Sequence, residues 1–202
     1  MAFLPRIFVP VAVAAALALA WSALHAFDDA RASTVVALDL QGLVDGAELG
    51  LEARVLETRV ERDLLGRPCT VVTLAVTRDF IARTDGVLDV RLPGGILPDG
   101  TGLILPGMPR LAAGEEVVLF LSESSSAGLR VPVGLAQGKF RVVRDARGAR
   151  TLERDGADLT LLDRTSGATS QAHLAAVFDY AAAVAEIEAA VARRPPSARG
   201  GK

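Results

Sequence analysis

Hydrophobic and polar residues alternate over much of the chain between positions 34 and 163. The clearest example is Leu51 to Glu61, where Leu51, Ala53 and Val55 fall on one side and Glu52 and Arg54 on the other. A period of two predicts a strand with one buried face. Further short runs lie at 69–76, 87–92, 129–135, 139–144, 151–152 and 159–162, with turn residues between them. About seven short strands at this spacing predict a mainly β fold, a barrel or a sandwich.

One continuous apolar run, Val117 to Leu121, departs from this alternation. It follows two turns, one containing Pro106, Gly107 and Pro109 and the other at Ala113-Gly114-Glu115. A short β-branched run between turn signals predicts a central strand that is covered on both faces. We therefore expect one face of this strand to line the barrel and the other to meet a helix.

Two helices are predicted, one at each end of the β region. A short N-terminal helix follows Asp39, with apolar residues at positions 40, 43, 44 and 47. A long C-terminal helix is expected over 171–194, capped by Thr169 or Ser170 and ended by Pro195-Pro196. An apolar stripe runs along this helix through Val177, Tyr180, Val184, Ile187 and Val191.

Two roles are open for this stripe. Its N-terminal half can close one side of the barrel. Its C-terminal half, with Val184, Ile187 and Val191, can remain exposed and pair weakly with another copy of the chain or with a partner.

The N-terminus carries a targeting pattern. Arg6 precedes an apolar, alanine-rich run from Ile7 to Leu24, and two small-residue cleavage sites end at Ala26 and Ala32. The pattern predicts a cleaved signal peptide and export to the periplasm or the medium, without membrane contact after cleavage. An uncleaved membrane anchor is the alternative. The domains expected are a signal peptide at 1–32, a β-barrel at 33–165, a helix at 166–194 and a flexible tail at 195–202.

Composition and the few candidate reactive residues exclude several classes of function. The net charge of −2 gives no electrostatic basis for binding nucleic acid. Cys69 is the single cysteine, so it forms no intrachain disulfide, and its place in an apolar strand predicts a buried thiol. Beyond the predicted signal the chain has one histidine, His173, which supplies neither a recognisable triad nor a zinc site. We therefore assign no catalytic, cofactor-binding or metal-binding residues and expect no cofactor.

Several segments between Leu38 and Asp145 carry a resemblance to known proteins: DLQGLVDGAELGLEARV, TVVTLAV, LPGG, LPGMPRLAAGEEVVLFL and VGLAQGKFRVV. In this order they resemble a group of uncharacterised exported bacterial proteins. More distantly they are similar to the OB-type barrel of netrin-like domains and tissue inhibitors of metalloproteinases. The resemblance implies an OB-like β-barrel. Those inhibitors chelate zinc through an N-terminal cysteine, which this chain lacks, so no inhibitory residue is carried over.

We accordingly expect a non-catalytic, exported interaction module of the bacterial cell envelope or secreted space. OB barrels bind through one face and its loops, which here are 93–109 and 122–128. Another protein is the expected partner, and the expected contacts are Pro106, Met108, Arg110, Val184, Ile187 and Val191. One alternative is a regulator or inhibitor of a secreted protease. The other is a hydrolase that uses acidic residues such as Glu115-Glu116 or Asp155 with Asp158.

Overall fold

The computed structural model describes residues 33–154, 159–171 and 176–195. The predicted signal peptide and its cleavage sites, Asp155, Asp158, His173 and the tail from residue 196 lie outside these ranges. None of the described helices is both long and apolar enough to cross a membrane.

The described residues are mainly β. Within the described ranges there are twelve strands: β1 (Ser33–Val36), β2 (Leu49–Arg62), β3 (Pro68–Ile81), β4 (Val87–Pro93), β5 (Gly95–Ile96), β6 (Gly102–Leu103), β7 (Glu116–Leu121), β8 (Lys139–Arg144), β9 (Arg150–Arg154), β10 (Leu159–Leu162), β11 (Thr169–Gln171) and β12 (Val177–Asp179). The helices are α2 (Leu40–Asp45), α3 (Tyr180–Arg193) and the 3-10 helix η1 (Leu135–Gly138). Asp39 caps α2, since its carboxylate accepts the N–H of Gly42 at 2.7 Å.

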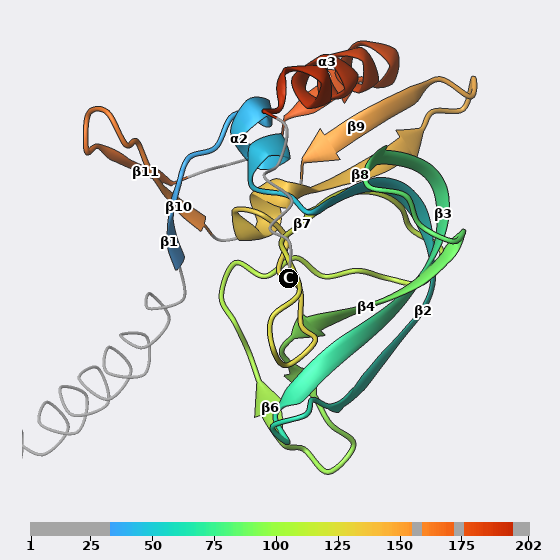
Figure 1. The fold of residues 1–202 in the computed structure, drawn as a ribbon, viewed down its shortest axis with the longest axis vertical. Helices are drawn as coiled ribbons and strands as arrows, with labels where there is room; N and C mark the ends of the chain where they lie inside the picture. Colours follow the sequence, from blue (N-terminus) through green and yellow to red (C-terminus); the bar gives the residue numbers. More distant parts are fainter. Residues whose placement is uncertain (1–32, 155–158, 172–175, 196–202) are drawn as a thin grey trace, which may run out of the picture. The chain divides into compact units, whose positions relative to one another are not determined.

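The main sheet has seven strands in the order β12-β9-β8-β7-β2-β3-β4, and each neighbouring pair is antiparallel. β2 and β3 form a long hairpin of 14 residues a side, which curves across the molecule in Figure 1. Register shifts near Gly50, Glu52 and Val55 interrupt the ladder of this hairpin, and such irregularities bend a strand. β1, β10 and β11 form a separate small sheet, and β5 pairs with β6.

The expectation of a closed barrel is wrong, because the described sheets are open. β4 and β12 are the two ends of the main sheet and do not pair with each other. A loop lies beside the outer edge of β4, where Arg130 donates its N–H to the carbonyl of Arg91 at 2.8 Å. β4 therefore has an irregular segment as its second neighbour, where closure needs a strand.

β7 is central, as predicted, and residues Val117 to Leu121 are fully buried. Val118 and Phe120 pack against α2 and α3 in one core cluster. Val117, Leu119 and Leu121 pack with β2, β3 and β4 in a second cluster on the opposite face. α2 and α3 lie side by side over the β8–β9 end of the sheet (Figure 1). The unbroken apolar run thus reflects a strand covered on both faces.

The C-terminal helix is shorter than expected. α3 begins at Tyr180, and the Asp179 carboxylate caps it by accepting the N–H of Ala182 at 2.9 Å. The preceding residues, Val177 to Asp179, form β12 against β9, because a β-branched and an aromatic residue extend the sheet there. Thr169 and Ser170, the expected caps, belong to β11.

The alternative that leaves the C-terminal half of this helix exposed is wrong. Val184 and Ile187 are 7% and 1% exposed, and Val191 packs partly buried against the same core cluster. α2 lies against the C-terminal half of α3: Gln41 donates to the Ala190 carbonyl at 3.2 Å, and Arg194 donates to the Ala47 carbonyl at 2.6 Å.

The strand expected over 129–135 is absent. This segment makes one isolated bridge, between Pro132 and Leu121, and then enters η1. Gly134 and Leu135 have φ values of 66° and 59°, and this left-handed conformation ends an extended chain.

Candidate binding groove

A groove of about 420 Å³ lies between one face of β2, β3 and β4 and the connection from β4 to β7. Its floor comes from β2, β3 and β4, through Thr58, Thr70, Val72 and Leu92. Its walls are residues 93–96, 103–105 and 108–111. In Figure 1 this connection, with β6, faces the ends of the long strands. We call this feature the loop groove.

Glycines and a threonine fix the point where the chain leaves β4 to form the groove wall. Gly94 and Gly95 have φ values of 97° and 141°. A Cβ on Gly95 would lie 2.7 Å from a methyl of Val60, so a larger residue fits neither the backbone nor the space. The Thr70 hydroxyl donates to the Gly94 carbonyl at 2.8 Å. The wall is therefore held close to the floor at its first residues.

Lys139 holds the other end of the wall. Its side chain is 2% exposed, and its ammonium group donates to the Arg110 carbonyl at 2.6 Å and to Glu115 Oε1 at 2.9 Å. The second oxygen of Glu115 accepts the N–H of Ala112 at 3.0 Å. We call this set of contacts the Lys139 anchor. Through the Arg110 carbonyl, this anchor fixes the position of the 108–111 wall of the groove.

Large aliphatic side chains remain exposed at the rim of the loop groove. Ile96, Ile104 and Leu105 are 60%, 70% and 36% exposed. Among the described residues that line the groove, Arg110 carries the single ionisable side chain, and it is exposed. Met108 is partly buried and packs against the second core cluster. The lining thus offers apolar contact and one cation.

The structure brings together part of the expected contact set. Met108 and Arg110 line the loop groove. Pro106 lies in the same connection but outside the lining, where its carbonyl accepts the Ser33 hydroxyl at 2.8 Å. The three helix residues expected as contacts belong to the core cluster with α3. Sequence reasoning missed Ile96 and Ile104, whose signal is an isolated isoleucine on either side of the 98–102 turn.

The second expected binding loop, 122–128, packs partly onto the outer face of the sheet. Ala127 and Leu129 form a small buried cluster with Cys69 and Val71. Cys69 is fully buried, as predicted, and burial raises the pKa of its thiol. This loop therefore covers a thiol that is less acidic than a free cysteine.

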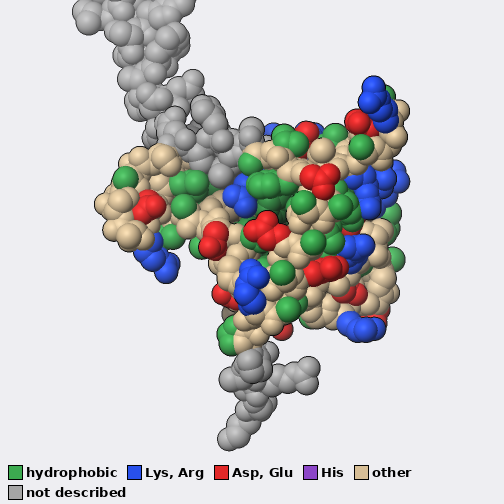
Figure 2. All heavy atoms as spheres, turned by 90° about the horizontal axis from the view of Figure 1, so that it is seen from above, with side chains coloured by type: hydrophobic (Ala, Val, Ile, Leu, Met, Phe, Trp, Pro, Cys, Tyr) green, Lys and Arg blue, Asp and Glu red, His purple; other side chains and the backbone are tan. Residues whose placement is uncertain are grey.

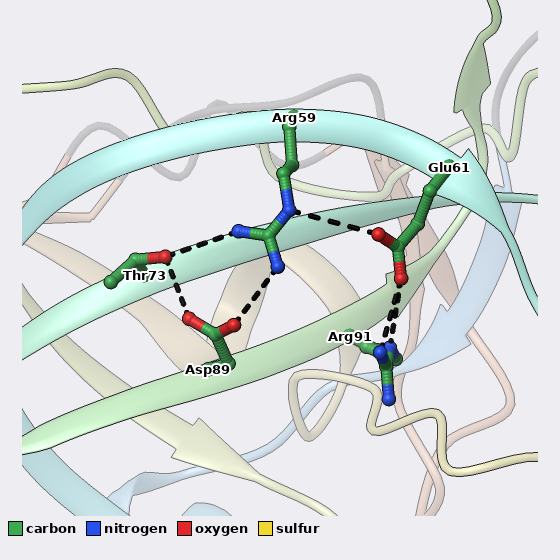
Figure 3. Close-up of polar contacts among 5 residues, drawn as sticks. All are labelled: Arg59, Glu61, Thr73, Asp89 and Arg91. Carbon is green, nitrogen blue, oxygen red and sulfur yellow. Dashed lines mark hydrogen bonds and ion pairs between the residues drawn. The ribbon is translucent and has the colours of Figure 1, made fainter.

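A network of charged side chains crosses the outer face of β2, β3 and β4 (Figure 3). Arg59 contacts Asp89 at 3.0 Å and Glu61 at 3.6 Å, and Glu61 also pairs with Arg91 at 3.1 Å. The Thr73 hydroxyl donates to Asp89 at 2.6 Å. Hydrogen bonds from Thr73 and Arg59 lower the pKa of Asp89. Each charge has an opposite partner, so this network stabilises cross-strand pairing and leaves no group free for chemistry.

A buried polar contact joins α3 to the sheet. Tyr180 donates its hydroxyl to Glu52 Oε2 at 2.7 Å, and the Arg150 guanidinium lies 3.5 Å above the Tyr180 ring. Burial, and then the hydrogen bond to Glu52, raise the pKa of Tyr180. Tyr180 is the first residue of α3, so this contact fixes the start of the helix on the sheet.

Within the described ranges no group of three or more His, Cys, Asp or Glu side chains is placed to hold a metal ion. Comparisons with protein-family models, curated proteins and solved structures found no match for this chain.

Proposed function

We propose that this protein is a non-catalytic binding module that holds apolar side chains of a partner protein in the loop groove. The observation that carries this proposal is the exposure of Ile96 and Ile104 at the rim of an apolar groove of about 420 Å³. Ligand-binding pockets typically measure about 300–1,000 Å³. Apolar side chains gathered on a surface mark interaction sites more often than isolated ones do.

The lining favours binding over catalysis. General acid–base or nucleophilic catalysis requires titratable or nucleophilic groups that converge on the bound molecule. Here Arg110 is the single ionisable group among the described lining residues. It makes no ion pair with any described residue, which leaves its guanidinium available for a carboxylate beside the apolar contact.

The shape of the groove favours a protein partner over a small molecule. A small ligand is usually buried over most of its surface. The rim residues Ile96 and Ile104 instead project into solvent beyond the groove. An apolar centre with an arginine at its edge is a common arrangement at protein interfaces.

The sequence of the first 32 residues supports an exported location for this binding module. A short positive start, an apolar run and an A-x-A site favour export, so we place the module in the bacterial envelope or the secreted space. Mass spectrometry of the N-terminus tests this part separately. Cleavage after Ala26 or Ala32 supports a cleaved, exported module, and an intact Met1 in the membrane fraction contradicts cleavage and supports the uncleaved anchor.

Site-specific photo-crosslinking tests the groove in the native host. A photoreactive phenylalanine at position 96 should capture one discrete partner. Ile104→Asp in the same background should abolish that product, because it puts a charge at the rim of the same groove. Position 87 is the control, since Val87 is 61% exposed at the far end of β4. A product at position 96 that persists in Ile104→Asp, or that also forms at position 87, would contradict the proposal.

A further inference from the structure

A second cavity lies beneath α3, on the opposite face of the main sheet from the loop groove. It measures about 150 Å³, and Phe140, Leu152, Phe178 and Ile187 supply apolar walls. Figure 2 views the molecule from the α3 side and shows hydrophobic side chains in the middle of this face, with charged side chains between and around them. We call this feature the Arg154 cavity.

The sheet register produces the cavity. Phe140 on β8 lies opposite Arg154 on β9, and Leu152 on β9 lies opposite Phe178 on β12, so these four side chains share the face that α3 covers. The rings of Phe140 and Phe178 meet edge to face at 6.2 Å. α3 contributes Ala183, Glu186 and Ile187 to the lining, and the single methyl of Ala183 fills less of the space than a larger side chain would.

Arg154 has an unusual environment for a cation. Its guanidinium carbon lies 4.9 Å from the centre of the Phe140 ring, and its Nε is buried without a hydrogen-bond partner. It forms no ion pair with a described residue. By contrast, nearby arginines are paired: Arg144 with Glu116 and Arg150 with Glu52. Burial lowers the pKa of Arg154.

An unpaired, half-buried guanidinium is costly, and an anion that reaches it removes that cost. Carboxylates fit guanidinium groups especially well, because two parallel N–H···O hydrogen bonds can form. A dry cavity of about 150 Å³ can hold a group the size of benzene. The cation and the apolar walls together therefore define one class of ligand.

We propose that the Arg154 cavity binds a carboxylate carrying a compact apolar group, with the carboxylate on Arg154 and the apolar group against Phe140 and Phe178. The same chemistry is offered by a free monocarboxylic acid and by the C-terminal residue of a polypeptide. This site is independent of the loop groove.

Glu186 sharpens the proposal, because its exposed carboxylate also borders the cavity. It forms no ion pair with Arg154 in the described structure. Its negative charge opposes an incoming carboxylate. Glu186→Gln should therefore strengthen ligand binding, which a purely structural role for Arg154 does not predict.

Titration of the purified protein with benzoate, followed by calorimetry and by chemical-shift changes, tests the site. Benzoate should bind saturably and benzamide, its neutral analogue, should not. Arg154→Met should weaken benzoate binding by about 10- to 100-fold, the range expected for a charge-assisted hydrogen bond. Arg144→Met is the matched control, since it removes a paired arginine from the neighbouring strand and should leave binding unchanged.

Ala183→Leu provides a second variant that keeps Arg154 and fills the cavity, and it should also abolish binding. Peptides ending in phenylalanine, as free acid and as amide, distinguish the two sources. Tighter binding of the free-acid peptide than of benzoate assigns the site to a polypeptide C-terminus, and the reverse assigns it to a small acid. Absence of benzoate and peptide binding, or equal binding by wild type and Arg154→Met, would overturn the proposal.

Discussion

Replacing Lys139 by methionine should both destabilise the protein and loosen the wall of the loop groove. Methionine keeps the length and apolar volume of the stem, so the change removes mainly the ammonium group. Two acceptors then lose their donor, the Arg110 carbonyl and Glu115 Oε1. The contact at Arg110, within the groove wall, and the contact at Glu115, just beyond it, are released together.

The size of the effect follows from burial. Removing one partner of a buried ion pair typically costs about 3–5 kcal/mol. Lys139 is 2% exposed, but Glu115 is 18% exposed and retains the Ala112 N–H, so we expect about 2–4 kcal/mol. Adding Glu115→Gln should recover about 1–2 kcal/mol, because it removes the unpaired charge while an amide oxygen can still accept from Ala112.

Urea unfolding followed by circular dichroism measures these free energies, and hydrogen exchange measures the wall. Lys139→Met should reduce protection at Ala112, whose N–H donates within the Lys139 anchor. Arg144→Met, which removes a half-exposed pair with Glu116, is the control and should cost under about 1 kcal/mol. A loss below about 1 kcal/mol for Lys139→Met, with unchanged protection at Ala112, would refute this reasoning.

Three further changes test other parts of the fold. Phe120→Ala should cost about 3–5 kcal/mol in urea unfolding, because Phe120 is fully buried and stacks edge to face with Phe140, and a loss under 1 kcal/mol would mean that β7 is not central. Tyr180→Phe should cost about 1–3 kcal/mol, because Oε2 of buried Glu52 loses its hydrogen-bond donor, and the raised pKa of Tyr180 implies that the stability advantage of wild type over this variant falls as the pH rises above about 10. Asp89→Asn should lower the urea midpoint at neutral pH. The lowered pKa of Asp89 stabilises the fold above the unfolded pKa of about 4 and this contribution disappears as the pH falls through the folded pKa, so the two proteins should converge in acid.

Local patterns were sufficient to predict the strands with one buried face. Leu51, Ala53 and Val55 are buried as expected, and the run at Val117 to Leu121 is the central strand. Glu52, expected on the exposed face of its strand, is buried instead, because Tyr180 of α3 packs on that face. The strand expected over 129–135 failed because Gly134 and Leu135 adopt left-handed backbone, which apolar content does not reveal. The helix begins at Tyr180 and not at Gln171, because Asp179 caps it there although the helical spacing of apolar residues includes Val177.

The candidate site depends on contacts between residues far apart in the chain, which local patterns do not specify. Lys139 meets Glu115 only because β8 pairs with β7 in the register that sets Lys139 opposite Leu119. The sequence does single out Lys139 by composition, since 20 of the 22 basic residues are arginine and Lys139 is one of two lysines. Ile96 and Ile104 gave no periodic signal, because β5 and β6 have two residues each. The prediction of a closed barrel was wrong because the neighbour of an edge strand lies far away in the sequence, where local patterns do not specify it.

The central claim is that the loop groove binds apolar groups, and titration with the uncharged dye N-phenyl-1-naphthylamine tests it most directly. Its fluorescence should rise saturably with the wild-type protein. Ile104→Asp should weaken dye binding by about fivefold or more, because it replaces apolar contact at the rim by a charge. Ile104 is 70% exposed, so the change does not disturb the core. Val87→Asp and Arg154→Met should bind the dye as wild type does. Equal dye affinity for wild type and Ile104→Asp would contradict the claim.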